Sequence, residues 1–184
     1  DSGASVVVAD ESVAETVQGV RPDCPDLEHV IQVDGTPRGE HHGFAELLRD
    51  HARTFEPVRP DADHPAIVLY TSGTTGEPKG VVHTRNWLVG HYPGYYMQYE
   101  CDVGNGVFWT PSDWAWMGAL APSVFPAWHY GRPVVGYPTG EFDPERTFEI
   151  IAEFGVTDTF VPPTAIRMLM SVADPADRYD LELS

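Results

Sequence analysis

The stretch that decides the fold class is IVLYTSGTTGEPKGVVHT, from Ile67 to Thr84. An apolar run, read as a strand over Ala66–Tyr70, leads into residues 71–76, which are only Thr, Ser and Gly. Glycines let a backbone approach a ligand closely, and successive N–H groups in such a turn form an anion site. Hydroxyls add donors and a lysine adds a compact positive charge. We therefore predict a phosphate-binding loop made of Thr71, Ser72, Gly73, Thr74, Thr75, Gly76 and Lys79.

The loop does not follow the common phosphate-loop pattern G-x-x-x-x-G-K-[ST]. Gly73 and Gly76 are too close together, and Gly80 follows Lys79 where that pattern has Ser or Thr. An ordinary phosphoryl-transfer NTPase is therefore disfavoured, and a plain polar turn is the alternative reading. We expect a helix from about Arg85, whose amino terminus would add to the anion site.

The rest of the chain alternates between strand-like and helix-like stretches. We expect strands at Ser5–Ala9, His29–Val33, Val107–Thr110, Pro133–Val135 and Thr157–Val161. We expect helices at Glu11–Gln18, Phe44–Ala52, Trp116–Trp128, Asp143–Phe154 and Thr164–Val172. This alternation predicts an α/β fold with a largely parallel sheet and flanking helices.

The chain is strongly acidic, with a net charge of −17 over 184 residues. Its cations are ten arginines and a single lysine, Lys79, which lies in the predicted phosphate loop. So acidic a surface disfavours nucleic acid and anionic lipid as partners. Acid excess together with lysine scarcity favours a protein adapted to a salty, halophilic cytoplasm, and a merely acidic protein is the alternative.

The length of the apolar runs and the spacing of the cysteines limit the class of protein further. No apolar run approaches the roughly 18–20 residues that span a bilayer. Cys24 and Cys101 are the only cysteines, and neither has a second cysteine at metal-ligand spacing. A disulfide scaffold or a zinc site is not expected, so we predict a cytoplasmic protein without a metal site of its own.

Both ends of the sequence suggest a longer protein. Ser5–Ala9 reads as a strand in mid-sheet, and DRYDLELS at the end follows a helix where another strand is expected. A parallel sheet that ends on a helix leaves apolar surface uncovered. We therefore expect a fragment of a larger chain.

Several segments resemble one family. YTSGTTGEPKGV, Tyr70 to Val81, resembles the signature loop of the adenylate-forming enzymes: acyl-CoA synthetases, peptide-synthetase adenylation domains and luciferases. FWTPSDWAWMGALAPSVFPAWHYGRPVV, Phe108 to Val135, resembles the substrate-pocket segment of acetyl-CoA and medium-chain acyl-CoA synthetases. GVTDTFVPPTAIRML and DSGASVVVAD are similar to a later and an earlier part of the same large domain.

The resemblance implies a two-step reaction on a small carboxylic acid. The acid reacts with ATP to give an acyl-adenylate and pyrophosphate, and coenzyme A then displaces AMP. The loop would hold the β- and γ-phosphates, Mg²⁺ would neutralise the triphosphate, and the role of Lys79 is left open. The residues expected to face the acyl group are Trp116, Gly118 and Ala119. For Trp116, and more so for Trp114, core packing is the alternative.

The resemblance also implies what this chain does not carry. Residues 1–184 would form part of the large N-terminal domain, incomplete at both ends, with the C-terminal domain absent. The family's metal-binding Glu, ribose-binding Asp and catalytic lysine belong to later motifs, so the catalytic residues are not among these. Two alternatives stay open: an adenylation module that loads a carrier protein, and a non-catalytic phosphate-binding α/β domain.

Overall fold

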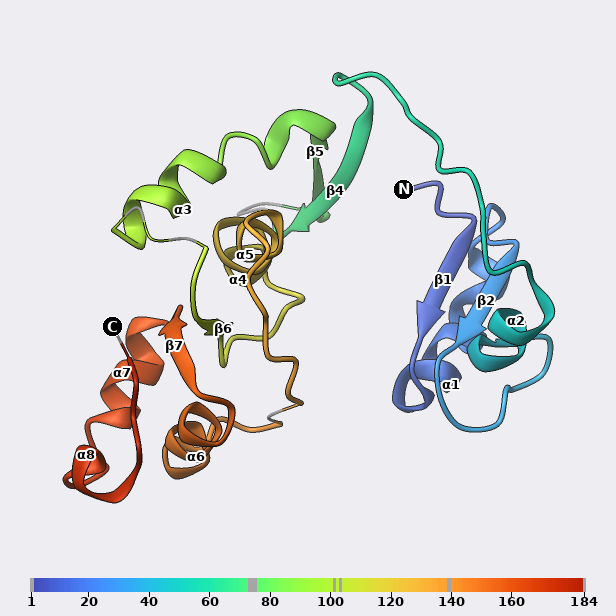
Figure 1. Ribbon diagram of the computed structural model, residues 1–184. Coiled ribbons are helices and arrows are strands. Elements are labelled where there is room, and N and C mark those ends of the chain that lie inside the picture. Colours follow the sequence, from blue (N-terminus) through green and yellow to red (C-terminus); the bar gives the residue numbers. More distant parts are fainter. Residues whose placement is uncertain (1, 73–75, 101, 103, 139, 184) are drawn as a thin grey trace. The chain divides into compact units, whose positions relative to one another are not determined.

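The computed structural model describes residues 2–72, 76–100, 102, 104–138 and 140–183 (Figure 1). The chain divides into two compact units, Asp1–Val82 and His83–Ser184. Among the described residues, no helix has the length and apolar character needed to cross a bilayer.

The first unit contains a small parallel sheet with strand order β1-β2-β3. Its elements are β1 (Val6–Ala9), α1 (Glu11–Val20), a 3₁₀ turn (Arg21–Asp23), β2 (His29–Gln32), β3 (His42–Gly43) and α2 (Phe44–Asp50). The Asp10 carboxylate caps α1 by accepting the Ser12 N–H at 2.7 Å. Ala14 on α1 is fully buried. These elements confirm the strands and helices predicted for residues 5–52 to within about two residues.

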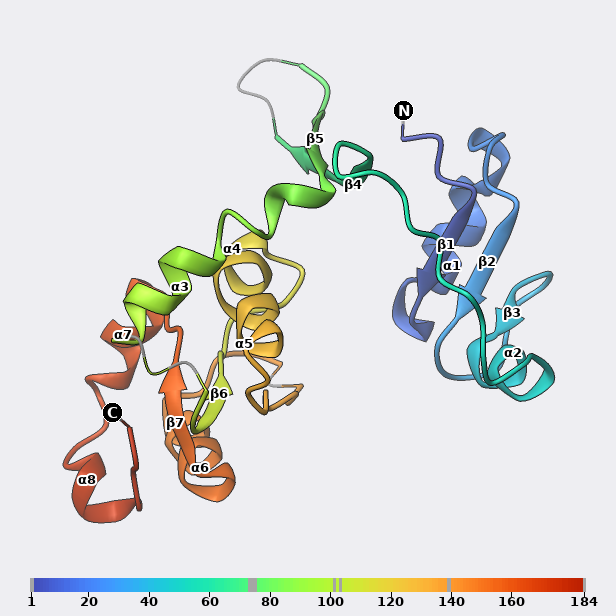
Figure 2. The same cartoon turned by 45° about the horizontal axis from the view of Figure 1, so that its top comes forward.

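A separate two-stranded sheet carries the predicted phosphate loop, between β4 (Pro65–Thr71) and β5 (Lys79–Thr84) (Figure 2). The connection 72–78 is shorter than the dozen or so residues that a parallel crossover needs, so the pair is a hairpin. The expectation of a helix from about Arg85 is wrong in its start. The β-branched residues Val81 and Val82, which precede Arg85, favour a strand and belong to β5. After β5, only a 3₁₀ turn covers Arg85–Trp87, and the next helix begins at Tyr92.

The second unit holds most of the helices. Its elements are the 3₁₀ turn Arg85–Trp87, α3 (Tyr92–Gln98), β6 (Val107–Trp109), α4 (Met117–Ala119), a π-helical stretch (Leu120–Val124), α5 (Phe125–His129), α6 (Pro144–Phe154), β7 (Val156–Thr159), α7 (Pro163–Leu169) and α8 (Pro175–Arg178). Pro93 lies in the first turn of α3, where its missing N–H costs nothing. The helix expected over residues 116–128 forms as three short pieces, with Pro122 inside the wide central one.

The sheet of the second unit is built around β6. β6 pairs parallel with β7, and its other side meets Val134 through a single parallel bridge at Phe108. The strand expected over Pro133–Val135 is thus reduced to one bridge, since Pro133 has no N–H to donate. A register shift between Val107 and Phe108 places Phe108 opposite Asp158.

Successive residues of β6 supply two hydrophobic cores. Phe108 packs with Tyr95, Val124 and Ala127 from α3 to α5. Trp109 packs with residues of the other core, which are Ile150, Ile151 and Val156. Because neighbouring side chains of a strand point to opposite faces, α6 covers one face and α3 and α5 cover the other, as Figure 1 shows. The prediction of an α/β fold with parallel sheets and flanking helices is confirmed.

The helix predicted over residues 143–154 is confirmed with both of its ends. The Asp143 carboxylate accepts the Glu145 and Arg146 N–H groups at 2.9 and 3.2 Å, and Pro144 occupies the first turn. The helix ends at Gly155, which adopts a left-handed φ of 57°. Glycine takes this conformation without strain.

A buried ion pair joins the elements of the second unit. Arg132, whose side chain is 1% exposed, binds Asp158 of β7 through Nη2 and the Tyr95 hydroxyl through Nη1. Its guanidinium carbon also lies 5.6 Å from the centre of the Tyr99 ring. Burial is the largest single influence and would lower the pKa of Arg132, but its interactions with Asp158 and Tyr95 together outweigh burial and raise that pKa. The cation is therefore held by a carboxylate, a hydroxyl and an aromatic face.

We predict that Asp158→Ala destabilises the protein by about 3–5 kcal/mol, because it leaves the Arg132 charge buried and unpaired. Urea unfolding followed by tryptophan fluorescence measures this. Glu149→Ala is the matched control, since its pair with Arg146 is exposed and exposed pairs contribute about 1 kcal/mol or less. Equal losses in both variants would contradict a structural role for the buried pair.

Candidate functional site

The described part of the predicted phosphate loop is open to solvent. Thr71 ends β4, Lys79 begins β5, and both are exposed. Gly76 has φ 98°, a conformation that favours glycine, and a Cβ there would meet open space. Gly73, Thr74 and Thr75 lie outside the described residues. Within the described part of the chain, no ion pair engages Lys79, so its charge is available to an anion.

Gly80 keeps the two strands of the hairpin close together just behind this lysine. A Cβ at Gly80 would lie 2.9 Å from Val68 Cγ1 and 3.2 Å from the Tyr70 ring. Only glycine fits there without moving these side chains. The glycine after Lys79, which distinguishes this loop from the common phosphate loop, thus has a packing reason. The loop lacks the following helix that we expected, so anion binding would depend on N–H groups, hydroxyls and Lys79.

A second candidate feature is a cavity of about 470 Å³ in the His83–Ser184 unit. It lies where β6 and the Val134 bridge end, and carboxyl ends of parallel strands are the usual place for ligands in α/β sheets. Its described lining residues are Thr110, Pro111, Ser112, Asp113, Trp114, Gly136, Tyr137, Pro138 and Gly140.

Two aromatic side chains form walls of this cavity, and a neighbouring side chain holds each of them in place. Trp114 meets Trp128 edge-on, with ring centres 5.8 Å apart. Trp114 also covers Gly136, where a Cβ would lie 3.8 Å from its indole. Tyr137 accepts a hydrogen bond of 2.7 Å from Arg146 of α6. The Arg146 guanidinium carbon lies 5.0 Å from the centre of the Tyr137 ring.

Most polar side chains of the cavity bind one another or the backbone. The Thr110 hydroxyl donates to the Phe160 carbonyl at 2.7 Å and accepts the Ser112 N–H at 3.2 Å. Asp113 accepts the Ala115 N–H at 2.8 Å, a bond within the turn that precedes α4. The Ser112 hydroxyl is buried and has no partner among the described residues. A smaller cavity of about 190 Å³ shares Pro111 and Ser112 with it.

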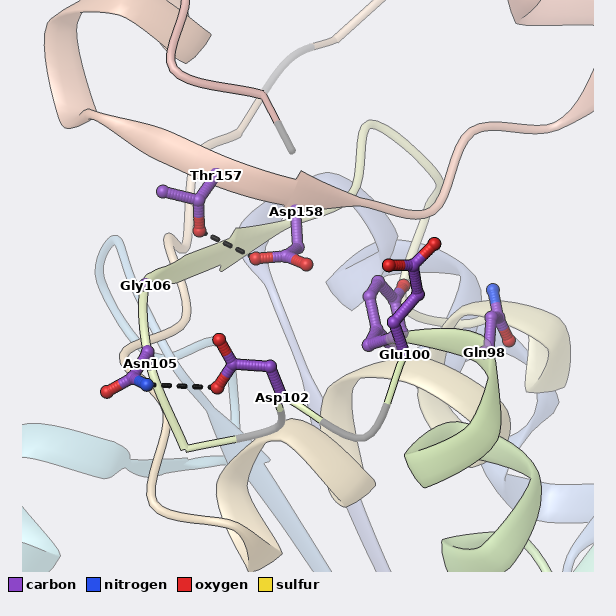
Figure 3. Close-up of a pocket in the computed structure, with 8 residues that line it drawn as sticks. Gln98, Glu100, Asp102, Asn105, Gly106, Thr157 and Asp158 are labelled. Atoms are coloured by element: carbon purple, nitrogen blue, oxygen red, sulfur yellow. Dashed lines mark hydrogen bonds between the residues drawn. The ribbon is translucent and has the colours of Figure 1, made fainter.

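A third cavity, of about 390 Å³, lies at the amino-terminal ends of β6 and β7 (Figure 3). Its lining includes the carboxylates of Glu100, Asp102 and Asp158. Asp158 is occupied by Arg132 and Thr157, and Asp102 accepts the Asn105 amide at 2.9 Å. This cavity thus lies beside the buried Arg132–Asp158 ion pair, at the amino-terminal end of the sheet.

Metal-ligating side chains do not gather in the part of the chain that the structure describes. No group of three or more His, Cys, Asp or Glu residues there could hold a metal ion.

The sequence profile of the family described as "AMP-binding enzyme" matches residues 1–183. The chain belongs to the AMP-binding enzyme family. Its resemblance to the adenylate-forming enzymes is thereby confirmed over nearly the whole length.

Relatives of this AMP-binding chain are acyl-CoA and acetyl-CoA synthetases. A mitochondrial acyl-coenzyme A synthetase of Homo sapiens is 30% identical over 172 residues, which cover 92% of this chain and 29% of that protein. The acetyl-coenzyme A synthetase of Thiobacillus denitrificans is 37% identical over 147 residues, covering 74% of this chain and 21% of that protein. The chain thus spans less than a third of the length of these relatives.

Solved structures of AMP-binding enzymes share the fold. An acyl-CoA synthetase of Brucella canis superposes with a TM-score of 0.79 at 25% identity, covering 99% of this chain and 33% of that one. An anthranilate CoA ligase in complex with anthranoyl-AMP superposes with a TM-score of 0.81 at 20% identity, covering 97% and 34%.

The three residues expected to face the acyl group lie at the start of α4 in this AMP-binding chain. The Trp116 side chain is 73% exposed, Gly118 is exposed with open space beside it, and Ala119 is buried. None of the three lines the 470 Å³ cavity, whereas Trp114 does. Sequence reasoning did not single out Thr110 or Tyr137, although Thr110 ends one predicted strand and Tyr137 lies two residues after another.

Proposed function

We propose that a full-length enzyme carrying this chain is an AMP-forming acyl-CoA synthetase of the cytoplasm. Residues 1–184 would form part of its large N-terminal domain. The observation that carries this proposal is the exposed pair Thr71 and Lys79 at the two ends of the connection between β4 and β5, with Gly80 behind the lysine. The relatives named synthetases support the same reaction class.

In the first step, a carboxylate oxygen of the acid attacks the α-phosphorus of ATP. The bond to the bridging oxygen breaks, and pyrophosphate leaves with the electron pair. Two anions must approach each other, so the reaction depends on alignment and on charge neutralisation. The hydroxyls and N–H groups of the loop would hold the β- and γ-phosphates and stabilise the charge that develops on the leaving group. Lys79 would add a positive charge that no described residue neutralises.

In the second step, the thiol of coenzyme A gives up its proton and its sulfur attacks the acyl carbon. The thioester forms and AMP leaves. Mg²⁺ would enter with ATP and neutralise part of the triphosphate charge. The acyl group would lie near Trp116, Gly118 and Ala119, where small residues leave room for it. The remaining groups needed for the reaction would come from parts of the enzyme outside this chain.

Acid-dependent exchange of labelled pyrophosphate into ATP tests the first step. In the full-length enzyme, Thr74→Ala or Thr75→Ala should lower this exchange by roughly 10²-fold, because each removes a donor to developing charge. Running the acid panel with and without coenzyme A separates a CoA ligase from a module that loads a carrier protein. Unchanged exchange in both variants would refute the pyrophosphate assignment, and no acid-dependent exchange in the wild type would favour a non-catalytic domain.

The acyl assignment predicts the effect of Gly118→Trp. A Cβ at Gly118 meets nothing within 4 Å, so the backbone should tolerate the change. A larger side chain would shorten the acyl site and reduce kcat/KM for longer acids much more than for acetate, since each methylene contributes about 1–3 kcal/mol to discrimination. Equal losses for all acids, measured on a correctly folded variant, would place Gly118 outside the acyl site.

We also propose that the acidic composition is an adaptation to a salty cytoplasm. At a net charge of −17, repulsion between surface carboxylates destabilises the folded state, and the Debye length falls from about 10 Å at 0.1 M salt to about 3 Å at 1 M. The melting temperature should therefore rise between 0.1 and 1 M KCl, while KM for ATP rises because the same ions screen the loop. A flat or falling melting temperature would point to another origin of the acidity.

A further inference from the structure

The 470 Å³ cavity at the carboxyl end of the sheet combines aromatic and proline walls with the Asp113 carboxylate, so its lining disfavours an anion and leaves apolar surface for an uncharged group. Its two largest walls are Trp114 and Tyr137, and its floor includes Gly136, which the Trp114 indole covers. No Lys or Arg is among its described lining residues. An anionic phosphate or carboxylate would find no cation there, so the charged end of a ligand would lie elsewhere.

The hydrogen bonds of the lining support the same conclusion. The side chains of Thr110, Asp113 and Tyr137 already bind Phe160, Ala115 and Arg146, respectively. Ser112 is the one lining hydroxyl that is buried without a partner in the described part of the chain. A ligand rich in amides or hydroxyls would leave most of its polar groups unpaired here, and each unpaired group costs about 1–3 kcal/mol.

Two contacts with Arg146 hold the Tyr137 ring in place. Arg146 donates to its hydroxyl at 2.7 Å and places a guanidinium against its ring. Arg146 is itself held by Glu149 at 2.7 Å, one turn along α6. Its hydrogen bonds to Glu149 and then to Tyr137 raise the Arg146 pKa. The wall is therefore anchored to a helix whose Ile150 and Ile151 side chains lie in the core.

We propose that this cavity takes the far end of the apolar tail of the carboxylic acid, beyond the part that would lie near Trp116, Gly118 and Ala119, and that Tyr137, positioned by Arg146, limits the length of the tail it admits. The inference rests on the proposed acyl-CoA synthetase activity and adds a specificity-determining residue to it. Tyr137 would face the tail, and Arg146 would act only through Tyr137. A fixed aromatic wall discriminates by size because the site cannot widen without breaking its anchor.

The test compares straight-chain acids from acetate to octanoate on the full-length enzyme. The readout is the ratio of kcat/KM for octanoate to kcat/KM for acetate. Tyr137→Ala should raise this ratio at least tenfold by opening the end of the cavity, and Tyr137→Trp should lower it by narrowing the cavity. Arg146→Met should raise it by a smaller factor, and it should add little to the effect of Tyr137→Ala.

Two matched variants control for indirect effects. Tyr96→Ala removes an exposed tyrosine of α3 that does not line this cavity. Arg167→Met removes an exposed arginine of α7 that does not line this cavity, and it is the control for Arg146→Met. Both should leave the ratio within about twofold of wild type. The Tyr137→Trp variant keeps the test decisive even if Tyr137→Ala folds poorly.

The outcomes separate this inference from the proposed function. Opposite shifts of the ratio in Tyr137→Ala and Tyr137→Trp support it. Wild-type exchange with an unchanged ratio in both variants overturns the inference and leaves the synthetase activity standing. A raised KM for coenzyme A with an unchanged ratio would assign the cavity to the thiol arm and also overturn it. Absence of acid-dependent exchange in the wild type would overturn both.

Discussion

The arrangement of the His83–Ser184 unit depends on one buried charge. Arg132 lies in the connection after α5, yet it binds Asp158 of β7 and the Tyr95 hydroxyl of α3. A buried guanidinium cannot be left unpaired without a large loss of stability, so these three segments have to meet at the amino-terminal end of the sheet. With that end fixed, the opposite ends of the strands present Thr110 and Tyr137 to one cavity.

This division between the two ends of the sheet explains how one small unit combines rigidity with a binding surface. Arg132 and Asp158 pair at the amino-terminal end, while the carboxyl end presents aromatic walls and the Ser112 hydroxyl, which has no partner among the described residues. The predicted phosphate loop would follow a different principle, because anion binding requires groups that are not satisfied internally. Lys79 illustrates this, being the single lysine of the chain and exposed.

The sequence predicted the fold class and most elements, and its failures have physical causes. The Asp143–Pro144 start of α6 is a local signal, and it was predicted to the residue. The strand β5 was missed because glycine, lysine and proline around Lys79 obscure the β-branched residues that follow. Tyr137 was missed because its role depends on Arg146, nine residues further along and on another element. Contacts of that kind leave no periodic pattern in a single sequence.

Because of the register shift between β6 and β7, the position of Asp158 depends on the number of residues in β7 more than on their identity. Val107 pairs with Val156 but Phe108 pairs with Asp158, so Thr157 is an extra residue in the ladder. The Thr157 hydroxyl accepts the Val107 N–H at 3.0 Å, in place of a backbone carbonyl of the ladder. Without this bulge the Asp158 side chain would point to the opposite face of the sheet, away from Arg132. Deleting one residue at this point would therefore separate acid from base, although every remaining side chain would be unchanged.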